Sequence, residues 1–223
     1  MQIRIDLKIC IILLIFLVTK QADLYLVFML FAILHELGHL ITGLILGFRP
    51  KSFSLMPMGL SICFKVKNQD YNKKIKNAKY ITLKKLLISF AGPLTNFTIA
   101  FLIAISSFEF LNVAKETIIY ANILIGLFNL IPIYPLDGGR IVKYIIHMQK
   151  NLRKSYKYTN LISNITLIII TAVSSIAILY LKNIAIVLIV MYLWILVIKE
   201  NNIYNKKMHL YKLVDNIEQN AIK

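Results

Sequence analysis

Two histidines and a glutamate stand close together inside an apolar stretch, in the order His35-Glu36-Leu37-Gly38-His39. Histidines four residues apart lie on one face of a helix, about 6 Å apart, which suits two ligands of one zinc ion. The carboxylate of Glu36 could reach a water molecule on that ion and act as its general base. Ionisable side chains are costly in lipid, so the motif predicts hydrolytic metal chemistry inside a membrane. The alternative is that these polar side chains only join helices by hydrogen bonds.

A third ligand is expected, because catalytic zinc usually keeps three protein ligands and one open position. The candidate is Asp137, within the segment Asn129–Arg140 of sequence NLIPIYPLDGGR. Its prolines and glycines interrupt the helical pattern, and irregular backbone at membrane depth is tolerated only where protein or a water-filled cavity surrounds it. The alternative is an exposed aspartate in an ordinary cytosolic turn.

The composition indicates a helical membrane protein that crosses the bilayer several times. Of the 223 residues, 58% are hydrophobic, and the mean hydropathy is +0.71, which is too apolar for a soluble domain of this size. We expect an all-α fold of about six transmembrane helices, predicted from apolar runs near residues 7–18, 24–48, 86–108, 117–136, 160–181 and 184–198.

The basic residues are distributed unevenly between the two sides that these spans define. All of the 26 lysines and arginines except Lys20, Lys115 and Lys182 fall in four segments on the side of the N-terminus, namely 1–8, 49–85, 137–159 and 199–223. Because basic loops stay in the cytosol, this predicts that both termini are cytosolic. The net charge of +16 then reflects orientation and contact with lipid headgroups, and we expect no nucleic-acid partner.

The pattern predicts one six-span domain over residues 1–200, with a cytosolic loop at 49–85 and a short cytosolic tail at 201–223. Within the loop, residues 52–66 partly alternate polar and apolar side chains, which favours a small β element at the membrane edge after the second span. Such an edge could pair with an extended substrate, with Phe53, Leu55, Pro57 and Gly59 as the candidate residues. The alternative is a re-entrant plug that seals the site.

Three elements in this order carry a resemblance to a known family. They are His35–His39, the Ala91-Gly92-Pro93-Leu94-Thr95-Asn96 segment, and the proline-rich Asn129–Gly139 segment. Over roughly residues 24–145 the chain resembles the site-2 protease family of intramembrane zinc metalloproteases (peptidase M50). It looks most like the sporulation branch, the stage IV sporulation protein FB type, in its six spans, its Leu55–Gly59 stretch and its Met208–Leu213 tail.

The resemblance implies a zinc metalloendopeptidase that cuts inside the membrane, near the cytosolic side. His35, His39 and Asp137 would hold one Zn²⁺, and Glu36 would be the general base. Asn129 would orient the substrate carbonyl or stabilise the oxyanion, and Asn96 is a weaker candidate for the same role. Hydrogen bonding between helices, and helix capping at Asn129, are the alternatives for these two amides.

The resemblance also implies a membrane-associated protein substrate and membrane partners that inhibit the enzyme. The branch cuts the precursor of a sporulation sigma factor, and the alternative substrate is an anti-sigma factor or another single-pass regulator. We expect no nucleotide-binding CBS domain after residue 200, which leaves regulation by ATP open.

Two other classes of function predict different sequence features. A membrane transporter of zinc would place further histidines or charged residues along several spans, and the sequence has almost none there. A silent scaffold would have lost Glu36 or a zinc ligand, and all of these residues are present.

Overall fold

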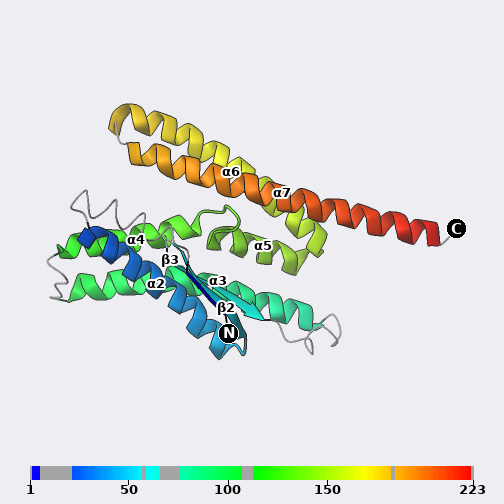
Figure 1. Ribbon diagram of the computed structural model, residues 1–223, viewed down its shortest axis with the longest axis horizontal. Coiled ribbons are helices and arrows are strands. Elements are labelled where there is room, and N and C mark those ends of the chain that lie inside the picture. Colours follow the sequence, from blue (N-terminus) through cyan, green and yellow to red (C-terminus); the bar gives the residue numbers. More distant parts are fainter. Residues whose placement is uncertain are drawn as a thin grey trace. The chain divides into compact units, whose positions relative to one another are not determined.

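The computed structural model describes residues 2–5, 22–56, 59–65, 76–106, 113–181 and 184–221. These residues form six helices and three strands (Figure 1). The chain divides into two compact units, Met1–Leu130 and Ile131–Lys223. The boundary falls within the proline-rich segment Asn129–Gly139, just before its first proline, and each unit is described by itself.

The first unit is built on three helices that pack against one another: α2 (Ala22–Ile45), α3 (Lys76–Ile105) and α4 (Lys115–Leu130). Aliphatic and aromatic side chains from all three helices form its core, namely Val27, Phe31, Ile103, Ile118 and Ala121. The outer faces of these helices are also apolar, with Ile41, Leu94 and Phe101 among the exposed side chains. A helix that is apolar on all sides is expected where its outer face meets lipid.

A small sheet completes the first unit. Its strands are β1 (Gln2–Ile5), β2 (Arg49–Met56) and β3 (Gly59–Lys65), in the spatial order β1-β2-β3. β2 and β3 form an antiparallel pair that contacts α2, so the strands predicted within residues 52–66 are present. β1 pairs in parallel with β2, with Gln2 opposite Ser52 and Ile5 opposite Leu55. The sequence analysis had treated these first residues only as a cytosolic end.

The second unit contains α5 (Asp137–Gln149), α6 (Leu152–Leu181) and α7 (Ile184–Ala221). α6 packs against both α5 and α7. Three asparagine amides join α6 and α7 in a closed ring of hydrogen bonds, from Asn160 to Asn201 (2.6 Å), from Asn201 to Asn164 (3.1 Å) and from Asn164 to Asn160 (3.1 Å). This ring fixes the register of the two helices.

Among the described residues, four helices are long and apolar enough to cross a membrane, in the segments Tyr25–Ile45, Lys79–Ile105, Leu152–Tyr180 and Ile186–Ile217. The chain is therefore a multi-pass membrane protein, and it is mostly helical as expected. The six predicted spans are not all seen. The first, at 7–18, lies outside the described residues, and α4 has 16 residues, which is short for a span that normally needs about 20.

Candidate metal centre

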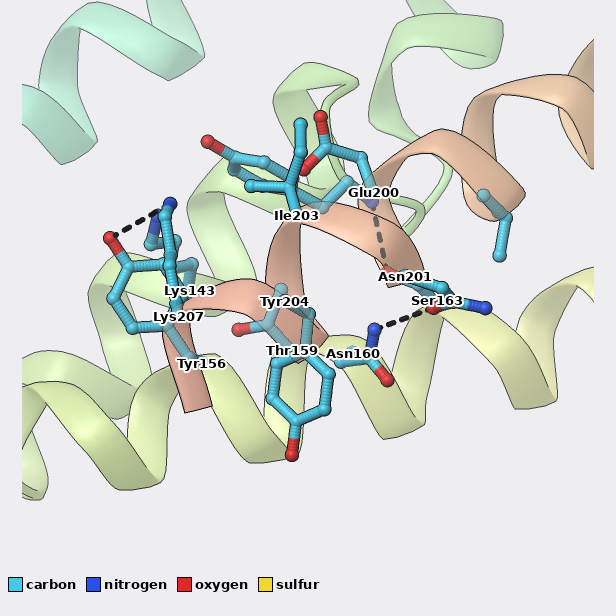
Figure 2. Close-up of a pocket in the computed structure, with 12 residues that line it drawn as sticks. Lys143, Tyr156, Thr159, Asn160, Ser163, Glu200, Asn201, Ile203, Tyr204 and Lys207 are labelled. Carbon is cyan, nitrogen blue, oxygen red and sulfur yellow. Dashed lines mark hydrogen bonds between the residues drawn. The ribbon is translucent and has the colours of Figure 1, made fainter. Parts of the chain in front are cut away.

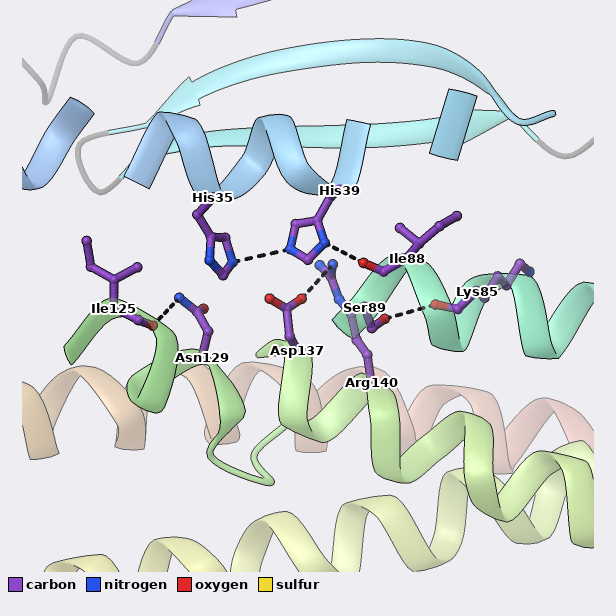
Figure 3. A network of polar contacts seen from close by, with 9 residues as sticks. All are labelled: His35, His39, Lys85, Ile88, Ser89, Ile125, Asn129, Asp137 and Arg140. Atoms are coloured by element: carbon purple, nitrogen blue, oxygen red, sulfur yellow. Dashed lines mark hydrogen bonds and ion pairs between the residues drawn. The ribbon is translucent and has the colours of Figure 1, made fainter. Parts of the chain in front are cut away.

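His35 and His39 are one turn apart on α2 and leave it on the same side (Figure 3). Both side chains are buried, with 3% and 4% of their surfaces exposed. The two rings meet edge to face, with their centroids 4.8 Å apart. Glu36 lies between them in the chain and is partly exposed. The motif thus combines two buried imidazoles with a carboxylate at a more open position.

Each imidazole is oriented by a hydrogen bond that it donates to an oxygen atom of α3. Nδ1 of His39 lies 2.6 Å from the carbonyl oxygen of Ile88, and Nδ1 of His35 lies 2.5 Å from Oδ1 of Asn96. A carbonyl oxygen can only accept, so His39 must donate its Nδ1–H. The amide oxygen of Asn96 likewise accepts from His35. In the neutral rings, both Nε2 atoms therefore carry the lone pair that a metal needs.

The two Nε2 atoms lie 3.2 Å apart. Two nitrogens at zinc–nitrogen distances of 2.0–2.1 Å in a tetrahedral site are about 3.4 Å apart. Two lone pairs at this separation repel each other unless a cation or a proton lies between them. The donor set, the tautomers and the nitrogen–nitrogen distance all fit a zinc ion held by His35 and His39.

A chain of buried amides sets the orientation of Asn96. Asn122 on α4 donates from Nδ2 to the carbonyl oxygen of Ile118 at 3.0 Å, which turns its Oδ1 toward Asn96. Asn96 then donates from Nδ2 to that oxygen at 3.0 Å, which leaves its own Oδ1 facing His35. Neither asparagine is exposed to solvent. The Ile118 carbonyl thus determines how the side-chain amides of Asn122 and Asn96 are oriented. As a result, an amide oxygen faces the His35 ring and accepts its Nδ1–H.

Asn122 was missed in the sequence analysis, which named Asn129 on the same helix and Asn96 on α3. The available signal was its spacing, because residues seven apart share a face of a helix. Asn122 and Asn129 therefore both mark the polar face of α4. Asn129 donates from Nδ2 to the carbonyl oxygen of Ile125 at 2.9 Å, within its own helix.

Replacing Asn122 with alanine is expected to weaken zinc binding by about 10- to 100-fold, the usual effect of removing a group that orients a ligand. Without Asn122, the Nδ2 group of Asn96 keeps only a long contact of 3.4 Å to the Phe31 carbonyl oxygen. The Asn96 side-chain amide can then flip and present its NH2 group, rather than its oxygen, to Nδ1 of His35. The measurement is competition for zinc against a chelator of known affinity. The matched control is Thr98→Ala, which removes an exposed hydrogen bond of α3. Unchanged zinc affinity in Asn122→Ala would contradict the orienting role.

Glycine at two positions lets α2 and α3 approach closely. A Cβ added to Gly92 would overlap the His39 ring and lie 2.6 Å from Nε2 of His35. A Cβ added to Gly38 would overlap the Thr95 side chain and lie 3.0 Å from the carbonyl oxygen of Ala91. Small residues at helix contacts are common in membranes, where close packing stabilises association. Here they also leave room for the two imidazoles.

Asp137 is the first residue of α5, in the second unit, and 4% of its surface is exposed. A carboxylate is favourable at this place because it faces the positive end of the helix dipole. Arg140, one turn later, has a guanidinium nitrogen 3.5 Å from Oδ1 of Asp137. The preceding turn is held by Tyr134, whose backbone N–H donates to the Ser163 hydroxyl at 3.0 Å. Asp137 is thus a buried carboxylate on a firmly anchored helix start.

Close packing against the preceding loop explains why residue 139 is a glycine. A Cβ at Gly139 would overlap the backbone of Tyr134 and lie 2.4 Å from the carbonyl carbon of Ile133. The first turn of α5 therefore lies directly on the preceding loop. Glycine at this position allows the buried placement of Asp137.

Tyr144, one further turn along α5, is a neutral phenol at physiological pH. Burial raises its pKa, and the positive charge of Arg140 partly offsets this rise. Tyr156 and Asp137 raise the pKa further. Tyr144 therefore adds no negative charge close to Asp137.

The β-hairpin residues proposed to pair with a substrate occupy different positions in the sheet. Phe53 and Leu55 are in β2, which has β1 on one side and β3 on the other. Gly59 is the first residue of β3, an edge strand among the described residues, and Pro57 lies outside the described residues. Of the candidate residues within the described strands, Gly59 alone lies on an edge strand, so a substrate that pairs with these residues would do so along β3.

Comparisons with known proteins agree with one another. A family model for peptidase family M50 matches residues 109–173. The chain is 30% identical over 142 residues to a zinc metalloprotease of Methanocaldococcus jannaschii, covering 61% of this chain and 38% of that protein. It is 26% identical over 145 residues to the stage IV sporulation protein FB of Bacillus subtilis, covering 63% of this chain and 46% of that protein. The chain thus matches less than half the length of each of these curated relatives.

A solved structure of similar fold is the site-2 protease from Methanocaldococcus jannaschii. It has a TM-score of 0.64 and 24% sequence identity, and the match covers 89% of each chain.

Proposed function

We propose that the chain belongs to the site-2 protease family of intramembrane zinc metalloproteases, peptidase family M50, and that it hydrolyses a peptide bond of a membrane-associated protein. The observation that carries this proposal is the histidine pair, in which each Nδ1–H is donated to α3 and the two Nε2 atoms lie 3.2 Å apart. That arrangement prepares both rings for a metal ion.

We propose His35, His39 and Asp137 as the three zinc ligands. All three are buried, and each offers one ligand atom of a kind that zinc accepts, two imidazole nitrogens and a carboxylate oxygen. Zinc would supply Lewis acidity and lower the pKa of a water molecule to about 7.

Glu36 has the role of general base. Its carboxylate takes a proton from the attacking water as the new carbon–oxygen bond forms at the peptide carbonyl. It then delivers that proton to the amide nitrogen as the carbon–nitrogen bond breaks, which releases a neutral amine. Asn129 is proposed to orient the substrate carbonyl, and the edge strand β3 to hold the substrate extended. Asn96 is fully buried and hydrogen-bonded to His35 and Asn122, so its contacts favour the alternative of hydrogen bonding between helices.

The proposed substrate is a sigma-factor precursor that is tethered to the membrane. Support comes from the similarity to the stage IV sporulation protein FB. The cut is proposed to lie near the cytosolic side of the membrane, and the distribution of basic residues supports cytosolic termini. An anti-sigma factor or another single-pass regulator is the alternative substrate. Membrane proteins that inhibit the enzyme are proposed as further partners.

The purified protein is expected to contain about one zinc ion per chain, and its peptidase activity should be lost on treatment with a chelator and return when zinc is added. Metal content is measured by mass spectrometry, and cleavage is followed by co-reconstitution with a tethered precursor. Full cleavage after complete zinc removal would contradict the proposal. A tethered anti-sigma factor, offered in parallel, separates the two substrate classes, because only one is expected to be cut.

A further inference from the structure

Tyr134, three residues before Asp137, joins the turn that precedes α5 to its surroundings in the second unit. Its backbone N–H donates to the hydroxyl of Ser163 on α6 at 3.0 Å. Its backbone also lies against the first turn of α5, where only a glycine fits at position 139. The ammonium group of Lys143, in the second turn of α5, lies 4.6 Å from the centroid of the Tyr134 ring. The turn before Asp137 is therefore attached both to α5 and to α6.

The part of α6 that carries Ser163 is held by α7. Asn160 and Asn164 stand on either side of Ser163 in the chain, and both belong to the ring of amide hydrogen bonds that Asn201 of α7 completes. Ser163, Asn160 and Asn201 line one small cavity of the second unit (Figure 2). Ser163 is itself buried, with 4% of its surface exposed. The oxygen that accepts the Tyr134 N–H is thus fixed in place by two helices.

The other backbone hydrogen bonds described for this turn are local. Leu136 donates to the carbonyl oxygen of Ile133 at 2.9 Å, and Ile133 donates to that of Ile131 at 2.7 Å. These bonds shape the turn but attach it to no other helix. The N-cap residue of α5 is Leu136, and an apolar side chain there cannot accept a hydrogen bond from the first turn. Among these described bonds, the one to Ser163 is therefore the bond that sets where α5 begins along α6.

We propose that Ser163 is a positioning residue of the metal centre, which holds the Asp137 carboxylate in place through the backbone of Tyr134. This inference rests on the proposed role of Asp137 as a zinc ligand. A buried N–H that loses its acceptor is costly, so the Tyr134 backbone would shift toward another partner and carry the start of α5 with it. The inference gives α6 and α7 a role in metal binding, in addition to crossing the membrane.

The test is a double-mutant cycle in the zinc affinity of the full chain, measured by competition against a chelator of known affinity. Ser163→Ala is expected to lower zinc affinity by about tenfold, the lower end of the effect of groups that orient metal ligands. Asp137→Ala should cause a larger loss, because it removes a ligand atom. If Ser163 acts through Asp137, adding Ser163→Ala to Asp137→Ala should cause no further loss. Ser163→Thr keeps the hydroxyl and should keep the zinc affinity of the wild type.

Thr171→Val is the matched control on the same helix. The Thr171 hydroxyl also accepts an N–H from another element, from the Trp194 indole of α7 at 3.2 Å. It lies about two turns farther along α6 than Ser163, away from the start of α5. Thr171→Val should therefore keep wild-type zinc affinity, even where the melting temperature of the zinc-free protein falls.

The cycle separates failure of this inference from failure of the proposed ligand set. Wild-type zinc affinity in Ser163→Ala, together with a loss in Asp137→Ala, would overturn the inference and leave Asp137 as a ligand. An equal loss from Ser163→Ala with and without the Asp137 carboxylate would also overturn it, because that result indicates a general effect on the fold. Wild-type zinc affinity in Asp137→Ala would contradict the proposed ligand set, and the inference with it. None of these measurements depends on peptidase activity.

Discussion

Replacing Glu36 with glutamine is expected to lower the rate of peptide hydrolysis by about two to four orders of magnitude, while zinc binding stays intact. Glutamine has the shape of glutamate but cannot take the proton from water. Because Glu36 lies between His35 and His39 in the chain and is not one of the proposed ligands, the imidazoles should keep their hydrogen bonds to α3. The measurement is cleavage of a membrane-tethered precursor, with the zinc content of each sample determined in parallel.

Asp23→Asn is the matched control for this change, because it removes a carboxylate from an exposed position in the first turn of the same helix. It should leave both cleavage and zinc content as in the wild type. Equal cleavage by the wild type and Glu36→Gln would exclude Glu36 as the base and indicate a contaminating protease. Loss of zinc from Glu36→Gln would instead give Glu36 a role in holding the metal site.

The histidine face of α2 was predictable from the sequence because its signal is local. An apolar run with His35 and His39 four residues apart can only present both rings on one side of a helix. The hydrogen bonds that select the tautomers come from Ile88 and Asn96, more than 40 residues away, and no local pattern specifies them. The sequence thus predicts that the two side chains lie together, and the structure adds the hydrogen bonds that leave a lone pair on each Nε2.

In the sheet, too, the pairing of neighbouring strands was predictable from the sequence, and the pairing of distant strands was not. The alternation within residues 52–66 predicted β2 and β3, which a short connection joins. β1 is only four residues long and pairs with β2 about 50 positions later, so nothing local distinguished it from the start of an apolar segment. Pairing between distant strands depends on the folded arrangement rather than on either segment alone.

Helix ends were harder to predict than helices. The expected span 117–136 was drawn from hydropathy, but α4 ends at Leu130 because Ile131 precedes a proline, which disfavours helical backbone there. The last helix was instead predicted too short, because its apolar run ends near residue 198. α7 continues to Ala221, since lysine, glutamate and glutamine are good helix formers even though they are polar.

Replacing Gly92 with alanine is expected to lower zinc affinity by at least about tenfold and to destabilise the fold by about 1–3 kcal/mol. The added methyl group would overlap the His39 ring and lie 2.6 Å from Nε2 of His35, so either the rings turn away or α2 and α3 separate. Both responses break the hydrogen bonds that α3 makes to the imidazoles. Zinc per chain and the melting temperature of the zinc-free protein measure the two effects.

Gly126→Ala is the matched control for Gly92→Ala, because Gly126 is also a buried helical glycine of the first unit. Its added Cβ would lie 3.0 Å from the Phe97 ring, and a side chain at this distance can shift by a few tenths of an ångström. Some loss of stability with normal zinc binding is therefore expected for Gly126→Ala. If both variants lost stability equally and both kept zinc, Gly92 would be only a packing residue. Selective loss of zinc from Gly92→Ala would show that close approach of α3 holds the two imidazoles in their metal-binding positions.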